Sequence, residues 1–192
     1  IKRLAKYLNR GPKNVVKFND QKCVNVITVW SDGDWAGSGP DCSRMSTSGG
    51  VMMLGSHTVK HCSSTQHTFA LSSDESEYYA FVKASSQAIG LQSMLSDVRI
   101  NAAIEVKTDA SAAIGISSRR GLGRVRHIEV AQLWIQEKVA SGELKLIKVL
   151  GQVNLADACT KHVPNDILLY HSEHPMQHAQ PGQHKLMPNI IA

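Results

Sequence analysis

The segment from Val24 to Gly37 has the clearest strand pattern in the chain, and the other predicted elements are arranged around it. Successive side chains of a strand point to opposite faces, and both faces of this segment are largely apolar. One face consists of Val24, Val26, Thr28 and Trp30, and the other consists of Asn25, Ile27, Val29 and Ser31. This pattern predicts a central strand that is covered on both sides. The strand ends at Asp32 and Asp34, where α/β sheets place ligands. Because Asp-Gly pairs also form ordinary turns, this site alone leaves both interpretations open.

Four further strands are predicted. Two of them, residues 49–54 and 58–62, come after the central strand and are separated from each other only by Gly55-Ser56-His57. We therefore expect these three strands to form an antiparallel meander. The other two cover residues 104–108 and 144–149, where alternation recurs. Since the strand over 104–108 follows a long helix, this α/β order predicts that it runs parallel to the central strand.

The long helix begins with a recognisable cap. Ser72-Ser73-Asp74-Glu75 matches the capping-box pattern, which predicts a helix from there to about Leu95. Its sheet-facing stripe has helical spacing and consists of Glu77, Phe81, Ala84, Ala88, Leu91 and Leu95. Glu77 heads this stripe, where a carboxylate requires a partner, a place at the sheet edge, or a cation. The alternative is that Glu77 is exposed and stabilises the helix N-terminus electrostatically.

Two short predicted helices are associated with acidic residues. One covers residues 111–117 directly after Asp109, and the other covers 155–161, with Asn154 as its cap and Asp157 in its first turn. If the strand before Asp109 is parallel to the central strand, Asp109 lies at the same sheet edge as the acids that end the central strand. The alternatives are that Asp109 caps the following helix and that Asp157 interacts with the helix dipole.

The remaining segments are less regular. Residues 118–126 form a Gly-rich loop with four arginines, which either grips phosphates through bidentate forks or is simply solvated. A helix ending at Gly142 is marked by Ile128, Ala131, Ile135 and Val139. Past Pro164 the chain is rich in His, Pro and Gln, which is typical of a tail or linker.

Composition narrows the functional classes. The 192 residues suffice for one domain with an appendage, and the net charge of +5 fits an anionic partner such as nucleic acid. No stretch approaches roughly 18 continuous apolar residues, so no membrane span is expected. The four cysteines are scattered without a Cys-x-x-Cys pair, which argues against structural zinc and for an intracellular setting. Because the chain begins with Ile1 inside an apparent helix, we expect it to be a fragment of a longer polypeptide.

The acidic residues near element ends suggest metal chemistry. If Asp32, Glu77, Asp109 and Asp157 converge on one edge of the sheet, they repel one another unless cations neutralise them. Carboxylate ligands without thiolates suit Mg²⁺ or Mn²⁺. Two such ions about 3.5–4 Å apart suit phosphodiester hydrolysis, in which one activates water and the other stabilises the leaving 3′-oxygen.

Six segments carry motifs that together resemble a known family. They are Ser31–Gly37, Arg44–Gly49, Leu71–Tyr78, Thr108–Ile114, Arg126–Glu129 and Leu155–Lys161. In order and spacing they resemble the ribonuclease H region of copia-type (Pseudoviridae-like) LTR retrotransposon polyproteins, over roughly residues 1–163.

The resemblance implies an α/β fold of the ribonuclease H-like class. We expect a mixed five-stranded sheet, with three antiparallel strands plus parallel strands, and helices on both faces. It divides the chain into a C-terminal helix of an upstream reverse transcriptase region or linker (1–20), the ribonuclease H-like domain (21–163) and a flexible tail (164–192).

The implied activity is a two-metal-ion endonuclease that cuts the RNA strand of an RNA–DNA hybrid during reverse transcription. By matching positions, Asp32 would bridge two Mg²⁺ or Mn²⁺ ions, Glu77 would help hold the ion on the substrate side, and Asp157 the ion that activates water. Asp109 completes the set, whereas Asp34 and Glu75 are neighbours that are not assigned. Candidate contacts to the hybrid are Arg44, Ser72, Arg124, Arg126 and His127.

The same resemblance implies a partner and a location. The reverse transcriptase domain of the same polyprotein would be a partner, no membrane would be involved, and an active element would place the protein in an intracellular, cytoplasmic virus-like particle.

The sequence differs from the usual pattern of this family at two places, and there are two alternative interpretations of its function. Residues 150–154 lack the His that cellular ribonucleases H usually carry before the last acid, and Ala110 and Ser111 replace the Asn and Gln that typically follow the third acid in the copia pattern. One rival is a weak or inactive module that binds nucleic acid without cutting it. The other is a transposase or integrase of related fold, but its acids would run Asp, Asp, Glu, whereas here Glu77 comes second and a fourth acid follows.

Overall fold

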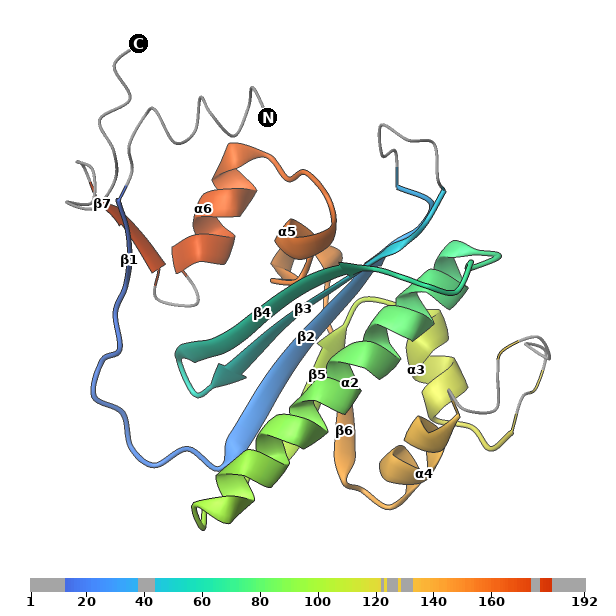
Figure 1. Cartoon of the computed structure of the whole chain (residues 1–192), viewed down its shortest axis with the longest axis horizontal. Helices are drawn as coiled ribbons and strands as arrows, with labels where there is room; N and C mark the ends of the chain where they lie inside the picture. The colour runs from blue at the N-terminus through green and yellow to red at the C-terminus, as the bar shows by residue number, and fades with distance from the viewer. Residues whose placement is uncertain are drawn as a thin grey trace.

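A five-stranded mixed sheet forms the centre of the protein. The structure is a computed structural model, and it describes residues 13–37, 44–121, 123, 128, 133–173 and 177–180. The strands stand in the order β4-β3-β2-β5-β6 (Figure 1). They are β2 (Val26–Asp34), β3 (Thr47–Leu54), β4 (His57–Thr65), β5 (Ala103–Thr108) and β6 (Leu144–Lys148). β2, β3 and β4 pair antiparallel, whereas β5 is parallel to β2 and β6 is parallel to β5. This arrangement confirms the predicted ribonuclease H-like fold, with the Val24–Gly37 segment supplying the central strand.

Alternation along the strands gives the sheet two apolar faces. On one face, Ile27 and Val29 of β2 join Ile104 and Val106 of β5 in the larger core. On the other face, Trp30 belongs to a smaller core, together with Val51, Met53, Leu155 and Ala156. Because successive side chains of a strand point to opposite sides, a strand that is apolar at nearly every position can serve both cores.

Helices cover both faces, as predicted. α2 (Ser73–Asp97) runs along one face with α3 (Ser111–Ser117) and α4 (Trp134–Ala140) beside it, and α5 (Asp157–Thr160) lies on the other (Figure 1). The predicted stripe of α2 is confirmed at Phe81, Ala84 and Ala88, which are buried, but the buried surface is wider than a single stripe and includes Tyr78 and Val82. A helix with neighbours on two sides, here the sheet and α3, buries more than one face.

The start of α2 confirms the capping pattern with one difference. The Ser72 hydroxyl accepts a hydrogen bond from the Glu75 backbone N–H at 3.2 Å, as a cap should. The Glu75 carboxylate does not return to the cap residue but accepts from the backbone N–H of Leu71 at 2.8 Å and from the hydroxyl of Tyr79 at 2.6 Å. Glu75 is therefore occupied in fixing the beginning of the helix.

Several elements differ from the sequence prediction. α5 begins at Asp157 and is shorter than the predicted helix over 155–161, because residues 155 and 156 form a turn. A short 3-10 helix, η2 (Gly151–Val153), precedes this turn. In the region assigned to a tail, α6 (Asn165–Glu173) is a helix, and β7 (Gln177–Gln180) pairs antiparallel with β1 (Lys13–Val16).

The three-part division of the chain stays a prediction. The helix expected near the N-terminus lies outside the described residues, and so does the first part of the helix that was expected to begin near Ile128. Among the helices that the structure describes, none is long and apolar enough to cross a membrane.

Candidate active site

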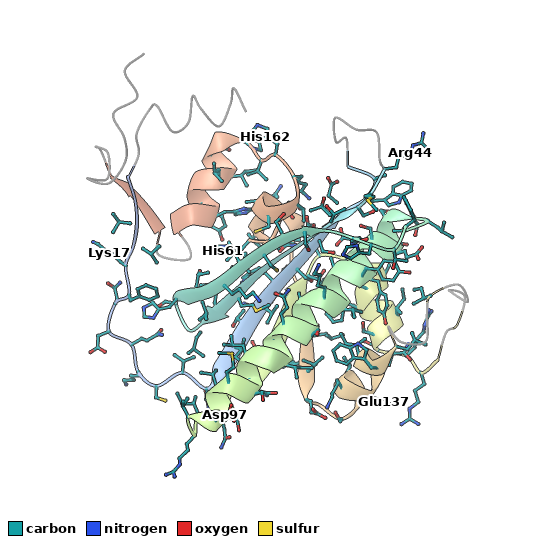
Figure 2. The ribbon with its side chains drawn as sticks, in the orientation of Figure 1. Lys17, Arg44, His61, Asp97, Glu137 and His162 are labelled. Atoms are coloured by element: carbon teal, nitrogen blue, oxygen red, sulfur yellow. The ribbon has the colours of Figure 1, made fainter. Side chains whose placement is uncertain are left out.

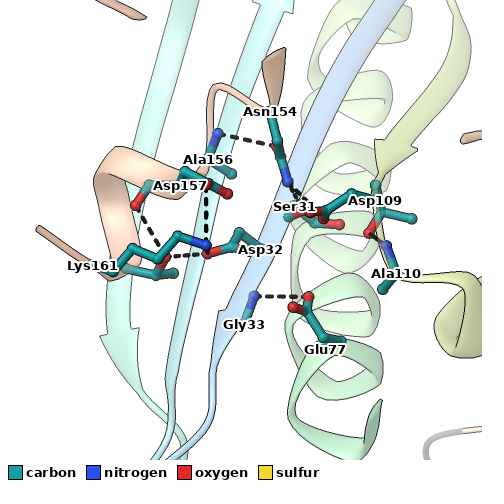
Figure 3. Close-up of polar contacts among 12 residues, drawn as sticks. Ser31, Asp32, Gly33, Glu77, Asp109, Ala110, Asn154, Ala156, Asp157 and Lys161 are labelled. Atoms are coloured by element: carbon teal, nitrogen blue, oxygen red, sulfur yellow. Dashed lines mark hydrogen bonds and ion pairs between the residues drawn. The ribbon is translucent and has the colours of Figure 1, made fainter. Parts of the chain in front are cut away.

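Three carboxylates from three elements meet at one edge of the sheet. Asp32 is near the end of β2, Asp109 directly follows β5, and Glu77 lies in the first turns of α2 (Figure 3). One carboxylate oxygen of each lies within 4.8 Å of the others. The meeting follows from topology: β2 and β5 are parallel neighbours, so their carboxyl ends coincide, and α2 starts beside the same edge.

Close packing between α2 and β2 holds Glu77 in this cluster. The backbone N–H of Gly33 donates to Glu77 Oε2 at 2.9 Å. A Cβ atom on Gly33 would lie 2.7 Å from the carbonyl oxygen of Ser76, so any larger residue would push the helix away. Glu77 thus contacts the strand that carries Asp32, which favours the inward-facing interpretation over that of an exposed residue at the helix N-terminus.

Asn154 connects Asp109 of the cluster to the central strand, β2. Its side chain is fully buried, and its Nδ2 donates to the carbonyl oxygen of Ser31 at 3.0 Å and to Asp109 Oδ1 at 3.1 Å. Its Oδ1 accepts from the backbone N–H of Ala156 at 3.2 Å. The sequence assigned Asn154 only to capping a helix. The structure shows instead that it bridges the central strand and Asp109, while α5 begins three residues later.

Asp109 is held at the site by its surroundings. Ala110 occupies the N-cap position of α3 and makes no side-chain capping bond, so the alternative in which Asp109 caps that helix is not what the structure shows. A Cβ atom on Gly151 would lie 2.8 Å from Asp109 Oδ2, which means that η2 approaches this carboxylate through a glycine.

The fourth predicted acid, Asp157, faces Asp32 from the first turn of α5. It is not one of the three mutually close carboxylates; instead a lysine stands between it and Asp32 (Figure 3). Lys161 Nζ lies 3.0 Å from Asp157 Oδ2 and 3.8 Å from Asp32 Oδ2. The hydroxyl of Thr160 also donates to Asp32 Oδ2. Close contact of α5 with β3 permits this approach, since a Cβ atom on Gly49 would lie 2.6 Å from Thr160 Cγ2.

Burial and neighbouring charges raise the pKa values of Glu77 and Asp157. Burial, followed by the negative charges of Asp32 and Asp109, raises the pKa of Glu77 to about 8, although the Gly33 hydrogen bond opposes the shift. Burial and the charge of Asp32 raise the pKa of Asp157 to about 6, against the opposing effect of Lys161. Partly buried carboxylates that lie close together favour protonation unless a cation is present. A bound cation would therefore be stabilised by these carboxylates and would favour their ionised forms.

The donor set fits a hard divalent cation. Asp32 is 1% exposed, and within the described part of the chain its Oδ1 has no hydrogen-bond partner. An unpaired, buried carboxylate oxygen beside two further carboxylates is costly without a cation. Because all the ligands are oxygens, Mg²⁺ or Mn²⁺ suits the site better than a softer metal.

Two of the predicted nucleic-acid contacts, Ser72 and Arg44, are described by the structure and are not part of this cluster. Ser72 is the cap of α2, five residues before Glu77. Arg44 is exposed, has a positive φ of 49°, and lies at the outer end of the strand pair β2–β3 (Figure 2). Arg124, Arg126 and His127 lie outside the described residues.

Sequence reasoning missed three residues that the structure places at the site, namely Asn154, Thr160 and Lys161. Lys161 was part of a quoted motif, and its spacing of four from Asp157 is that of an ion pair on a helix, which is the signal that could have identified it. Asn154 carried no such signal because its partners, Ser31 and Asp109, are distant in sequence.

Comparison with known proteins finds sequence similarity to transposon polyproteins. It is 28% identical over 164 residues to the retrovirus-related Pol polyprotein from transposon RE1 of Arabidopsis thaliana, covering 84% of this chain and 11% of that protein. It is 29% identical over 143 residues to the Pol polyprotein from transposon TNT 1-94 of Nicotiana tabacum, covering 73% of this chain and 11% of that protein.

The solved structures that resemble this chain have low sequence identity to it. A ribonuclease H1 isolated from compost is 19% identical, with a TM-score of 0.49, and the match covers 71% of this chain and 94% of that one. No protein-family model matches the chain. The chain is thus similar in sequence to retrovirus-related Pol polyproteins of plant transposons, and it spans a segment that makes up 11% of the length of these relatives.

Proposed function

We propose that this chain is a ribonuclease H that hydrolyses the RNA strand of RNA–DNA hybrids with the help of divalent metal ions. The observation that carries the proposal is the convergence of Asp32, Glu77 and Asp109, with one oxygen of each within 4.8 Å of the others. Homology to transposon Pol polyproteins supports it, because reverse transcription produces such hybrids.

The carboxylates have distinct roles in this proposal. Asp32, Glu77 and Asp109 hold one cation, and Asp32 with Asp157 faces a second. These residues would hold Mg²⁺ or Mn²⁺, and the chemistry that such ions would supply is the activation of water and the stabilisation of the leaving 3′-oxygen. Asn154 keeps Asp109 in position through its hydrogen bond of 3.1 Å, and the Gly33 N–H does the same for Glu77 at 2.9 Å.

The substrate would be recognised through its backbone. Phosphates meet basic side chains, for which Arg44, Arg124, Arg126 and His127 are the candidates, with Ser72 at the start of α2. The 2′-hydroxyl groups distinguish an RNA strand from DNA. In the cell, the chain would act as part of a polyprotein with its reverse transcriptase domain, in a virus-like particle.

A cleavage assay with matched variants tests the proposal. The full chain is incubated with a labelled RNA–DNA hybrid and Mn²⁺ or Mg²⁺, beside Asp32→Asn and Asp97→Asn. Asp97 ends α2, at the far end of the helix from Glu77 (Figure 2), and its variant changes the net charge equally. We expect the wild type and Asp97→Asn to cut the RNA strand and Asp32→Asn to lose at least a hundredfold in rate.

The assay also identifies the alternative. A wild-type chain that binds the hybrid tightly but leaves it uncut at high concentration with Mn²⁺ would be a nucleic-acid-binding module and not a nuclease. Equal cutting by the wild type and Asp32→Asn would attribute the activity to some other site or to a contaminant.

A further inference from the structure

We infer that Lys161 is the resident cation of the Asp32–Asp157 half of the site, so that a second divalent ion binds only by displacing its ammonium group. The inference rests on the proposed function in treating these carboxylates as metal ligands. It makes the two halves of the site unequal, with one half open to an ion and the other already occupied and partly neutralised by a lysine of the chain itself.

The two oxygens of Asp32 have different surroundings. Oδ2 accepts from the Thr160 hydroxyl and lies 3.8 Å from Lys161 Nζ. Oδ1 is buried and has no hydrogen-bond partner among the described residues. One oxygen of this carboxylate is therefore occupied by the α5 side of the site, whereas the other accepts no hydrogen bond from the described residues.

Lys161 stands where a second ion would have to bind. Its ammonium lies 3.0 Å from Asp157 Oδ2 and 3.8 Å from Asp32 Oδ2, between the two carboxylates. A Mg²⁺ ion bridging the same two oxygens would need them at about 2.0–2.1 Å. An ammonium and a divalent ion cannot share that space, and their like charges repel.

Among the described residues, no cationic group contacts the half of the site formed by Glu77 and Asp109. The polar contacts there are with uncharged groups, namely the Gly33 N–H to Glu77 and the Asn154 amide to Asp109. Because Lys161 acts on these two acids only from a distance, the first ion enters the less compensated part of the cluster and binds more tightly than the second.

Lys161 is able to leave. Its side chain is 44% exposed, against 1% for Asp32, and it ends in a flexible four-carbon stem. Displaced from the carboxylates, the ammonium can turn to solvent or to an anionic group of a bound ligand. The lysine thus offsets one of the two negative charges of the Asp32–Asp157 pair whenever the second ion is absent.

Metal titration of the full chain tests the inference directly. Mn²⁺ binding is measured by calorimetry, with bound ions counted by electron paramagnetic resonance, for the wild type, Lys161→Met and Lys138→Met. Lys138 pairs with Glu143 at the exposed end of α4, so its variant loses the same charge away from the site. In wild type and Lys138→Met, we expect the second ion to bind at least tenfold more weakly than the first.

The Lys161→Met variant distinguishes the outcomes. We expect its second ion to bind at least tenfold more tightly than that of the wild type, and its melting temperature in EDTA to fall and to recover with Mn²⁺. A second dissociation constant within twofold of the wild-type value, or a weaker one, would overturn the inference.

A measurement on the wild type covers the case in which Lys161→Met does not fold. During a Mg²⁺ titration, the side-chain NMR signals of Lys161, assigned through Lys161→Arg, should shift with the second ion and not with the first; a shift complete with the first ion would overturn the inference. Hybrid cleavage is followed in parallel. Ordered ion binding without cleavage would refute only the nuclease proposal, and cleavage with unchanged ion binding in Lys161→Met would refute only the role of Lys161.

Discussion

Replacing Glu77 by Gln should make the metal-free protein less sensitive to pH. The pKa of Glu77 is raised from 4.5 to about 8, first by burial and then by Asp32 and Asp109. Between these values the folded protein keeps a proton that the unfolded chain releases, so the free energy of unfolding falls as pH rises from about 4.5 to 8. In Glu77→Gln that contribution is absent, because the amide does not ionise in this range.

The magnitude follows from the size of the shift. At about 1.4 kcal/mol per pKa unit, a rise from 4.5 to about 8 corresponds to ~5 kcal/mol when the carboxylate is fully ionised. Glu77 is only partly buried, so solvent screening reduces this to ~3 kcal/mol. Gln can still accept the Gly33 N–H bond through its carbonyl oxygen, which keeps the geometry of the site comparable.

Urea unfolding in EDTA at a series of pH values measures the effect. From pH 5 to pH 9, the wild type should lose about 3 kcal/mol more than Glu77→Gln. Residual pH dependence in the variant comes partly from Asp157, whose pKa is raised to about 6. Glu137→Gln, at an exposed position of α4, serves as the control and should follow the wild type.

Parallel curves for wild type and Glu77→Gln would refute the reasoning, because they would mean that the Glu77 carboxylate is neither dehydrated nor close to other acids. With saturating Mg²⁺ the difference should shrink, because a bound cation favours the ionised form and its binding releases a proton near pH 7.

Two further substitutions test the packing that positions the acids. Gly33→Ala places a Cβ 2.7 Å from the Ser76 carbonyl oxygen, so it should cost about 1–3 kcal/mol in urea unfolding and weaken the first Mn²⁺ site; unchanged stability would contradict the close approach of α2 to β2. Asn154→Ala removes the amide that donates to the Ser31 carbonyl and to Asp109, and it should cost about 1–3 kcal/mol by leaving a buried acceptor unpaired, whereas a loss below about 0.5 kcal/mol would show that this bridge is not structural.

Local patterns in the sequence determined the elements that carry the acids. The alternation along Val24–Ser31 predicted a central strand, which the structure has as β2 (Val26–Asp34), and the Ser72 cap predicted where α2 begins. Both features depend on residues that are neighbours in the chain or one helical turn apart, so their physical basis is present in the sequence itself. The parallel pairing of β2 and β5 was then a short inference, since β5 directly follows the long helix α2 in the chain.

Tertiary structure alone decided how the last part of the chain completes the site. The bond from Asn154 to the Ser31 carbonyl joins residues 123 positions apart, and no local pattern encodes it. Lys161 reaches Asp32 only because α5 packs on the second face of the sheet, with Gly49 allowing Thr160 to approach. The pairing of β1 with β7 has the same origin. Such contacts depend on which faces bury together across the whole chain, which is why the sequence located the acids but only the structure placed a lysine between two of them.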